Sequence, residues 1–201
     1  MYRDRLRVGP ALALGLVLMI GGCGDEPAAT GTAGAGGWST PGCGLARVPE
    51  TVTVGDTVLP ATPPALESVM AEIDRAGRGA HADSFAGLEV DQKQVRAIVY
   101  RVPSAAFDEF IRGSAGNTCV VVRDAPHSTK DLAVWHDKVL ADLPFWTNRG
   151  IRIVSIGARH DGTGVEIATQ DLHRADLELP ARYGARAPLL FVESAPARPL
   201  R

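Results

Sequence analysis

Aromatic residues are scarce in this chain, at 5% of its 201 residues, and no dense run of lysine or arginine occurs in it. Surfaces that bind single-stranded nucleic acid rely on aromatic stacking, and phosphate contacts require a basic patch. The formal net charge is −2. It becomes −4 without the first 22 residues, which hold three arginines and one aspartate. We therefore expect no nucleic-acid partner.

The motifs of several enzyme classes are also missing. No serine stands in a Gly-x-Ser-x-Gly elbow, and no two cysteines have the Cys-x-x-Cys spacing of zinc sites. Gly162 and Gly164 precede a predicted strand, whereas a phosphate-binding loop opens a helix. A metal or acid–base site built from His160, Asp161 and His173 would require a hairpin tip to fold over a helix. We expect no enzymatic activity, no cofactor and no bound metal.

The one long apolar run is near the N-terminus, from Ala11 to Ile20, and it is about half of the ~20 residues that a membrane-spanning helix needs. Arginines precede it, and Gly21, Gly22 and Cys23 follow it. This order is typical of a signal peptide. If Cys23 stands there by chance, the leader is that of an ordinary secreted protein and not that of a lipoprotein.

The residues from Ile20 to Cys23 resemble the lipobox of bacterial lipoproteins. The resemblance implies that residues 1–22 are removed and that Cys23 carries a diacylglycerol and a further acyl chain such as palmitate. Several acyl chains hold a protein durably on a bilayer. We therefore expect a lipid-anchored protein on the extracytoplasmic face of the cell membrane.

Residues 23–63 are rich in Gly, Ala, Thr and Pro, which predicts a flexible tether. Within it, the alternation of valine and threonine from Thr51 to Leu59 predicts a strand or a small hairpin that turns at Gly55 and Asp56. The tether would hold the folded domain, residues 64–201, away from the membrane.

Two cysteines remain if Cys23 is lipidated, and the space outside the membrane permits a disulfide between them. A bond between Cys43 and Cys119 would join the end of the tether to the core of the domain. The alternative is that Cys119 is a small buried apolar residue and that Cys43 is a free thiol.

Apolar periodicity, with Ser, Pro and Gly at the ends of segments, predicts helices and strands throughout residues 64–201. The expected helices are Pro64–Ala76, a short helix from Ser104 that stops at Gly113, Ser128–Leu143, which Pro144 ends, and Leu172–Tyr183, which contains Pro180. The expected strands are Phe85–Val90, Val95–Val102, Thr118–Val122, Ile151–Ala158, Val165–Thr169 and Leu189–Val192.

Two segments, about 84–123 and 150–193, align with one another at an offset of roughly 70 residues. Each reads as strand, strand, helix, strand, and the Ser128 helix joins them. The sequence therefore predicts an α+β fold of two related β-β-α-β units, in which small antiparallel or mixed sheets pack with helices. Trp135 and Trp146 are expected to fill the space between the two halves.

Several phrases carry a family resemblance: FAGLEVD at 85–91 with the hairpin after it, RGSAGNTCVVV at 112–122, and GIRIVSIGARHDGTGVEIA at 150–168. Over Pro64–Val192 the chain is similar to the pro-region of secreted chymotrypsin-like proteases of the streptogrisin and alpha-lytic type. In that family the pro-region is an intramolecular folding chaperone and a tight inhibitor of the protease. The sequence has no GDSGG-like nucleophile segment, so the chaperone role is not expected here. The resemblance implies a fold and binding to protein surfaces through a sheet edge.

These observations favour a membrane-anchored lipoprotein with a non-catalytic protein-binding domain, with a secreted serine protease as one candidate partner. The alternatives are a structural or envelope-maintenance lipoprotein and a small-ligand-binding lipoprotein with a pocket between the halves. An exposed, uncharged strand edge would favour protein binding. A closed apolar cavity of roughly a few hundred Å³ would favour a small ligand.

Overall fold

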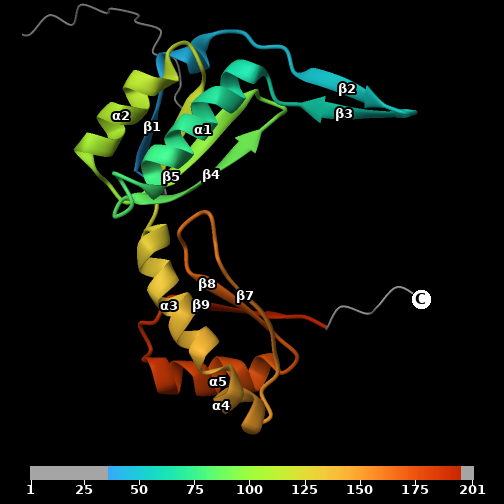
Figure 1. The fold of residues 1–201 in the computed structure, drawn as a ribbon, viewed down its shortest axis with the longest axis vertical. Helices are drawn as coiled ribbons and strands as arrows, with labels where there is room; N and C mark the ends of the chain where they lie inside the picture. The colour runs from blue at the N-terminus through green and yellow to red at the C-terminus, as the bar shows by residue number, and fades with distance from the viewer. Residues whose placement is uncertain (1–35, 196–201) are drawn as a thin grey trace, which may run out of the picture. The chain divides into compact units, whose positions relative to one another are not determined.

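The computed structural model of the chain describes residues 36–195, which have an α+β fold (Figure 1). The helices are the 3₁₀ helix η1 (Pro41–Gly44), α1 (Pro64–Arg78), α2 (Ala105–Ala115), α3 (Thr129–Ala141), α4 (Leu143–Asn148) and α5 (Leu172–Tyr183). The strands are β1 (Gly37–Ser39), β2 (Glu50–Val54), β3 (Thr57–Ala61), β4 (Phe85–Asp91), β5 (Arg96–Arg101), β6 (Val120–Asp124), β7 (Ile153–Ala158), β8 (Val165–Thr169) and β9 (Leu189–Glu193).

The first sheet has the strand order β1-β6-β5-β4. Strand β5 is antiparallel to β4 and parallel to β6, and β1 pairs with β6 in the antiparallel sense. Alternate residues of β5 and β6 point toward one face, where they meet α1 and α2. The first core is made by these buried side chains, which include Leu66, Ile73, Phe85, Ala97, Val99, Phe107, Ile111, Val120 and Val122.

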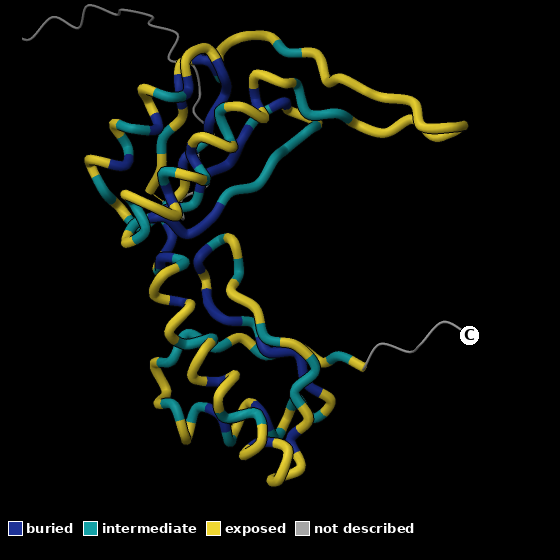
Figure 2. Tube along the Cα trace, viewed as in Figure 1, coloured by how far each residue is buried: buried dark blue, intermediate teal, exposed yellow. Residues whose placement is uncertain are grey.

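The second sheet has the strand order β7-β8-β9, and β8 is antiparallel to β7 and parallel to β9. Its apolar face packs with residues of α3, α4 and α5. Figure 2 shows the buried residues gathered where the sheets meet the helices. The second core consists of Leu132, Val139, Trp146, Ile151, Val165, Ile167, Ala175 and Leu179.

The two units therefore repeat the same topology, as the sequence predicts. In each unit an antiparallel pair leads through a helix to a parallel third strand, and each antiparallel pair has a register shift near its start. The central helix begins at a capping box in which Ser128 and Asp131 bond to each other's backbone N–H groups. The predicted α+β fold of two joined β-β-α-β units is confirmed.

Trp146 does not fill a space between the halves. It is 1% exposed and belongs to the second core, where its Nε1 donates to the Tyr183 hydroxyl at 2.9 Å. Trp135 is partly buried and packs against the same core. The large apolar area of both rings thus stabilises the second unit.

Helix ends differ from the prediction at three positions. Helix α2 does not stop at Gly113 but continues to Ala115, and Gly116 follows it at φ +53°. Helix α1 does not end at Gly77 but continues to Arg78. Gly77 instead allows close packing, since a Cβ there would lie 2.5 Å from the ring of Phe85. Pro144 does not follow the central helix directly, since α3 ends at Ala141 and Pro144 stands in the first turn of α4. Proline is favoured there because its missing N–H would have no partner within the helix.

Part of the segment that the sequence assigns to a tether is folded. Strand β1 hydrogen-bonds along β6, η1 follows it, and β2 and β3 form an antiparallel hairpin that turns at Gly55 and Asp56. The folded region thus includes residues well before Pro64. Cys23 and the leader lie outside the described residues.

Candidate protein-binding surface

Strand β9 is an edge of the second sheet with little charge on it. Among the described residues it pairs only with β8. Its sequence is LLFVE, so Glu193 is its one charged residue. Leu189 and Phe191 pack against the second core, whereas Leu190 and Val192 are 36% and 37% exposed. An uncharged edge of this kind is a template for strand addition.

The hydrogen bonds at the two ends of β9 show which of its backbone groups face outward. Val165 N–H donates to Pro188 O at 2.7 Å, and Ser194 N–H donates to Thr169 O at 2.9 Å. Backbone groups alternate in direction along a strand, so the N–H and C=O groups of the even-numbered residues of β9 face β8. The N–H and C=O groups of Phe191 and Glu193 therefore point away from the sheet and can receive an incoming strand.

A groove of about 800 Å³ runs between β9 and the start of α5. Leu190 and Phe191 contribute apolar surface to it, and the α5 side contributes His173 and Asp176. An extended segment paired with β9 would place alternate side chains over this groove. The groove could thus supply side-chain selection in addition to backbone hydrogen bonds.

The other outer strands of the two sheets are β1, β4 and β7. Strand β1 has three residues. The start of β4 is occupied, because Thr129 Oγ1 donates to Ala86 O at 2.6 Å and Gly87 lies against the main chain of His160. Beside β7, residues of α3 and of the strand line a shared hollow of about 200 Å³. The groove of about 800 Å³ beside β9 is larger than this hollow, which favours β9 for an incoming segment.

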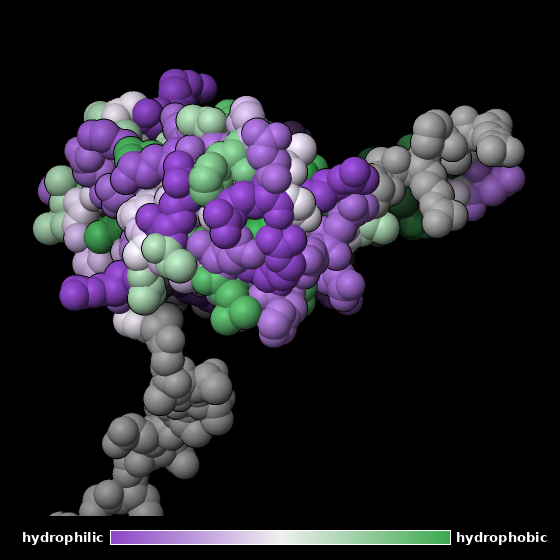
Figure 3. Space-filling view, turned by 90° about the horizontal axis from the view of Figure 1, so that it is seen from below, coloured by the Kyte–Doolittle hydropathy of each residue, from purple (hydrophilic) through white to green (hydrophobic). Residues whose placement is uncertain are grey.

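The face of the molecule at the α4 and α5 end is different in character. Figure 3 views this end and shows mostly hydrophilic side chains, with apolar ones in small separate groups. Two ion pairs lie here: Arg182 Nε is 2.7 Å from Asp142, and Arg149 Nε is 2.9 Å from Glu178. A solvated, charge-paired surface is not typical of the centre of a protein interface.

The turn between β7 and β8 is held by Asp161, one of the residues considered for a metal or acid–base site. Its carboxylate accepts hydrogen bonds from Thr163 Oγ1 at 2.6 Å, Thr163 N–H at 3.1 Å and Arg159 Nη2 at 3.0 Å. Burial alone would raise the pKa of Asp161, but the bonds from Arg159 and Thr163 outweigh it and hold the pKa well below its ordinary 3.8. The role of Asp161 is structural here, as in many turns.

Replacement of Asp161 by asparagine is expected to destabilise the domain by about 1 kcal/mol at pH 7, because a charged acceptor of several hydrogen bonds is lost. A carboxylate with a lowered pKa contributes stability above its ordinary pKa and loses it as pH falls toward the pKa of the folded state. The difference between wild type and Asp161→Asn should therefore shrink below about pH 4. Urea unfolding across pH measures this.

Glu109→Gln is a matched control, since Glu109 is exposed on α2 and has no hydrogen bond or ion pair within residues 36–195. It should leave stability unchanged at pH 7. An Asp161→Asn deficit that stays constant down to pH 2.5 would show that the loss does not arise from the charge.

His160 lies beside the first sheet and does not join His173. Its Nε2 is 3.0 Å from Glu89 Oε2, and its ring packs edge-on against Tyr100 at 5.7 Å between centroids. Tyr100 donates to the other oxygen of Glu89 at 2.9 Å. Burial, and next the hydrogen bond to Glu89, raises the pKa of Tyr100, so its hydroxyl remains a donor. These contacts hold the β7–β8 turn to the first sheet.

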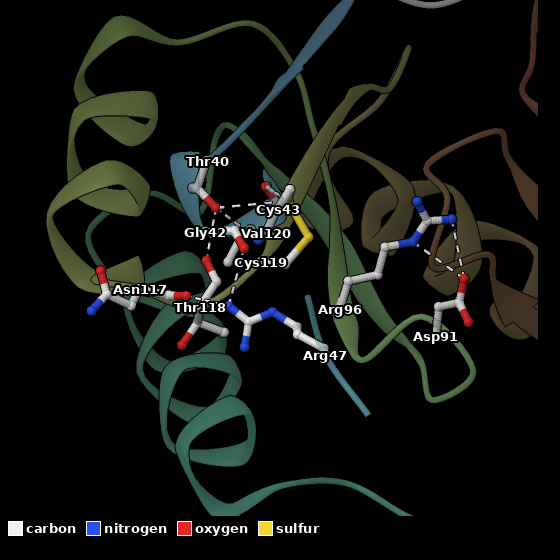
Figure 4. Close-up of a disulfide and its surroundings, with 10 residues drawn as sticks. All are labelled: Thr40, Gly42, Cys43, Arg47, Asp91, Arg96, Asn117, Thr118, Cys119 and Val120. Atoms are coloured by element: carbon white, nitrogen blue, oxygen red, sulfur yellow. Dashed lines mark hydrogen bonds and ion pairs between the residues drawn. A yellow bond between two sulfur atoms is a disulfide. The ribbon is translucent and has the colours of Figure 1, made fainter. Parts of the chain in front are cut away.

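The predicted disulfide between Cys43 and Cys119 is present, with the sulfur atoms 2.09 Å apart (Figure 4). It joins η1 to the start of β6. Beside it the buried Thr40 donates through Oγ1 to Thr118 O at 2.8 Å and accepts from Val120 N–H at 2.9 Å. These bonds continue the backbone pairing of β1 with β6. The disulfide and the hydrogen bonds therefore hold the same segment against β6.

Arg47 and Gly42 complete this junction (Figure 4). Arg47 Nη2 donates to Gly42 O at 3.1 Å and also to Asn117 O. A Cβ on Gly42 would lie 2.4 Å from Asn117 O, so a larger residue would force the two segments apart. The roles of Arg47 and Gly42 were not predicted from the sequence, although the Gly-Cys-Gly triplet at 42–44 is a signal of close backbone approach.

The residues considered for other chemistry are dispersed. Ser104 and Ser128 cap α2 and α3, as predicted, and Asp171 caps α5. Within residues 36–195 no group of three or more His, Cys, Asp or Glu side chains could hold a metal ion. The position of β9 at an edge was not predicted from the sequence either, although the strand has no charged residue before Glu193.

In the part of the chain that the structure describes, no helix is both long enough and apolar enough to cross a membrane. We compared the chain with protein-family models, with curated proteins and with solved structures, and none of the three comparisons found a match.

Proposed function

We propose that this chain is a membrane-anchored extracytoplasmic lipoprotein whose domain binds an extended segment of another protein beside β9. The observation that carries the proposal is the edge itself: outward backbone groups at Phe191 and Glu193, exposed apolar side chains at Leu190 and Val192, and a groove alongside. Strand addition supplies affinity through main-chain hydrogen bonds and selectivity through alternate side-chain positions.

The resemblance to protease pro-regions suggests a secreted serine protease as the first partner to test. A protein on the outer face of a membrane would meet such secreted proteins. The anchoring half of the proposal depends on Cys23, and lipid on this cysteine would retain the domain at the surface. A small ligand is less favoured, since the groove beside β9 is open and has Asp171, Asp176 and Glu193 along it.

Photo-crosslinking on cells tests the proposal. A crosslinking residue at Val192, whose side chain is exposed on β9, is expected to capture one dominant protein. The same residue at Val134, also a valine and more exposed at 53%, lies on α3; it is the matched control and should not capture the partner. Mass spectrometry should place the crosslink in an extended segment of the partner.

The anchor is tested on the same cells. Cys23→Ala should move the chain from the membrane fraction to the soluble or secreted fraction. A partner captured equally from Val192 and Val134, or from neither, would contradict binding at β9. Membrane retention that is unaffected by Cys23→Ala would contradict the lipid anchor without affecting the β9 test.

A further inference from the structure

The β2–β3 hairpin is exposed along almost its whole length (Figure 2). Four of its apolar side chains are between 44% and 63% exposed: Val52, Val54, Val58 and Leu59. None of the hairpin residues belongs to either of the two cores in residues 36–195. A two-stranded hairpin alone in water is only marginally stable, so a neighbouring strand would be expected to stabilise this one.

The two outer edges of the hairpin differ in their hydrogen-bonding capacity. The turn residues are Gly55, at φ +61°, and Asp56, so Val54 and Thr57 flank a two-residue turn and bond to each other. Because bonded and non-bonded pairs alternate, the outward groups of β2 belong to Thr51 and Thr53. Both residues have an N–H to donate.

The outward groups of β3 belong to Val58 and Pro60, which lie opposite Thr53 and Thr51. Proline has no N–H, so it blocks one of the two outward donors of β3. Strand β2 has no proline and no charge from Thr51 to Val54. The free edge of β2 is therefore the one that can extend the hairpin.

We propose that β2 pairs with β2 of a second copy of this chain, antiparallel and about a two-fold axis at Val52. In this register Thr51 of each copy lies opposite Thr53 of the other. Both outward residues of each strand then make their N–H and C=O bonds, four in all by this geometry. A two-fold interface must be self-complementary, and this edge meets that requirement.

Charge and side-chain direction favour the same register. A shift of the axis to Thr53 would place Glu50 opposite Asp56 of the second copy, and like charges directly opposite one another destabilise a sheet. With the axis at Val52, Glu50 lies opposite Val54 instead. Val52, Val54 and Leu59 share one face of the hairpin with Glu50 and Thr57. Pairing of the two copies places these three apolar side chains of each on the same face of a four-stranded sheet.

Cysteine crosslinking in the full chain with Cys23→Ala tests both partner and register. Val52→Cys should form a disulfide-linked dimer under mild oxidation, since residue 52 faces its own copy across the axis. Thr53→Cys, which would face residue 51, and Val58→Cys, on β3, are matched controls and should give roughly tenfold less dimer. Equal crosslinking from all three positions, or more from Val58→Cys, would overturn the proposal.

Sedimentation of the same chain without added cysteines supplies a second test. Thr53→Pro removes an outward N–H that has no partner within the hairpin, so it should convert the dimer to a monomer, whereas Thr53→Ala should remain dimeric. A chain that is monomeric before substitution would refute self-pairing. A monomeric chain that sediments together with phosphatidylcholine vesicles would assign the hairpin to a lipid surface instead.

Discussion

Loss of the Cys43–Cys119 disulfide is expected to reduce the free energy of unfolding by about 4 kcal/mol. The bond joins residues 76 positions apart, and breaking it lets the unfolded chain explore many more conformations. This entropic gain rises with the length of the closed loop and is large for a loop of this size. Few single features of a domain contribute as much to its stability.

The loss should also be felt locally at β1. The disulfide holds η1 against β6, and without it β1 depends on its backbone bonds and on Thr40. Amides of β1 should therefore exchange hydrogen faster than those of β5, which is flanked by strands on both sides.

Urea unfolding of the double variant Cys43→Ala with Cys119→Ala measures the global effect, and reduction of the wild-type chain is the matched comparison. The two treatments should agree, because both remove the cross-link. A loss below about 1 kcal/mol in both would show that the bond closes a loop that is already restricted in the unfolded chain.

Much of the fold could be predicted because local patterns and topology agree. Strand β8 and helix α5 have the bounds that their periodicity predicts, and Ser128 three residues before Asp131 identifies the start of α3. The repeat could be found because both units need the same alternation of apolar residues to bury one face of a sheet.

Strand β1 could not be predicted in the same way. Three residues are too few for periodicity, and the glycines around Trp38 suggest a flexible segment. Its place in the sheet depends on long-range bonds to β6 and on the disulfide. The position of His160 beside Glu89 likewise depends on how the two units pack, which no local pattern encodes.

The binding edge was implied only indirectly. A strand with one apolar face reads alike in the middle of a sheet and at its edge, so LLFVE does not by itself identify β9 as an outer strand. The distinction follows from topology: a parallel third strand joined through α5 lies outside β8. The absence of charge before Glu193 then becomes informative, because outer strands often carry charges that prevent unwanted pairing.

Glu193→Pro is expected to weaken binding of a β9 partner about tenfold or more. The outward N–H of Glu193 would donate to an incoming strand, and one hydrogen bond contributes roughly 1 kcal/mol or more. The proline ring would also occupy space that this strand needs. The fold should tolerate the change, because the side chain of Glu193 is exposed and the lost N–H faces away from β8.

Glu193→Ala distinguishes the contribution of the backbone N–H to binding from that of the side-chain carboxylate. It removes the same carboxylate but keeps the N–H, so it should bind nearly as wild type if the strand edge provides the affinity. Thermal unfolding of both variants should give midpoints close to that of the wild-type chain. A lower midpoint for Glu193→Pro would indicate damage to β9 itself.

The most direct measurement is therefore the affinity of the protein captured from Val192 for three chains: wild type, Glu193→Ala and Glu193→Pro. Binding by a strand beside β9 predicts that Glu193→Ala retains the wild-type affinity and that Glu193→Pro alone loses about tenfold or more. Equal affinities for the proline and alanine variants would mean that the partner does not pair with the β9 backbone, and they would contradict the proposed function.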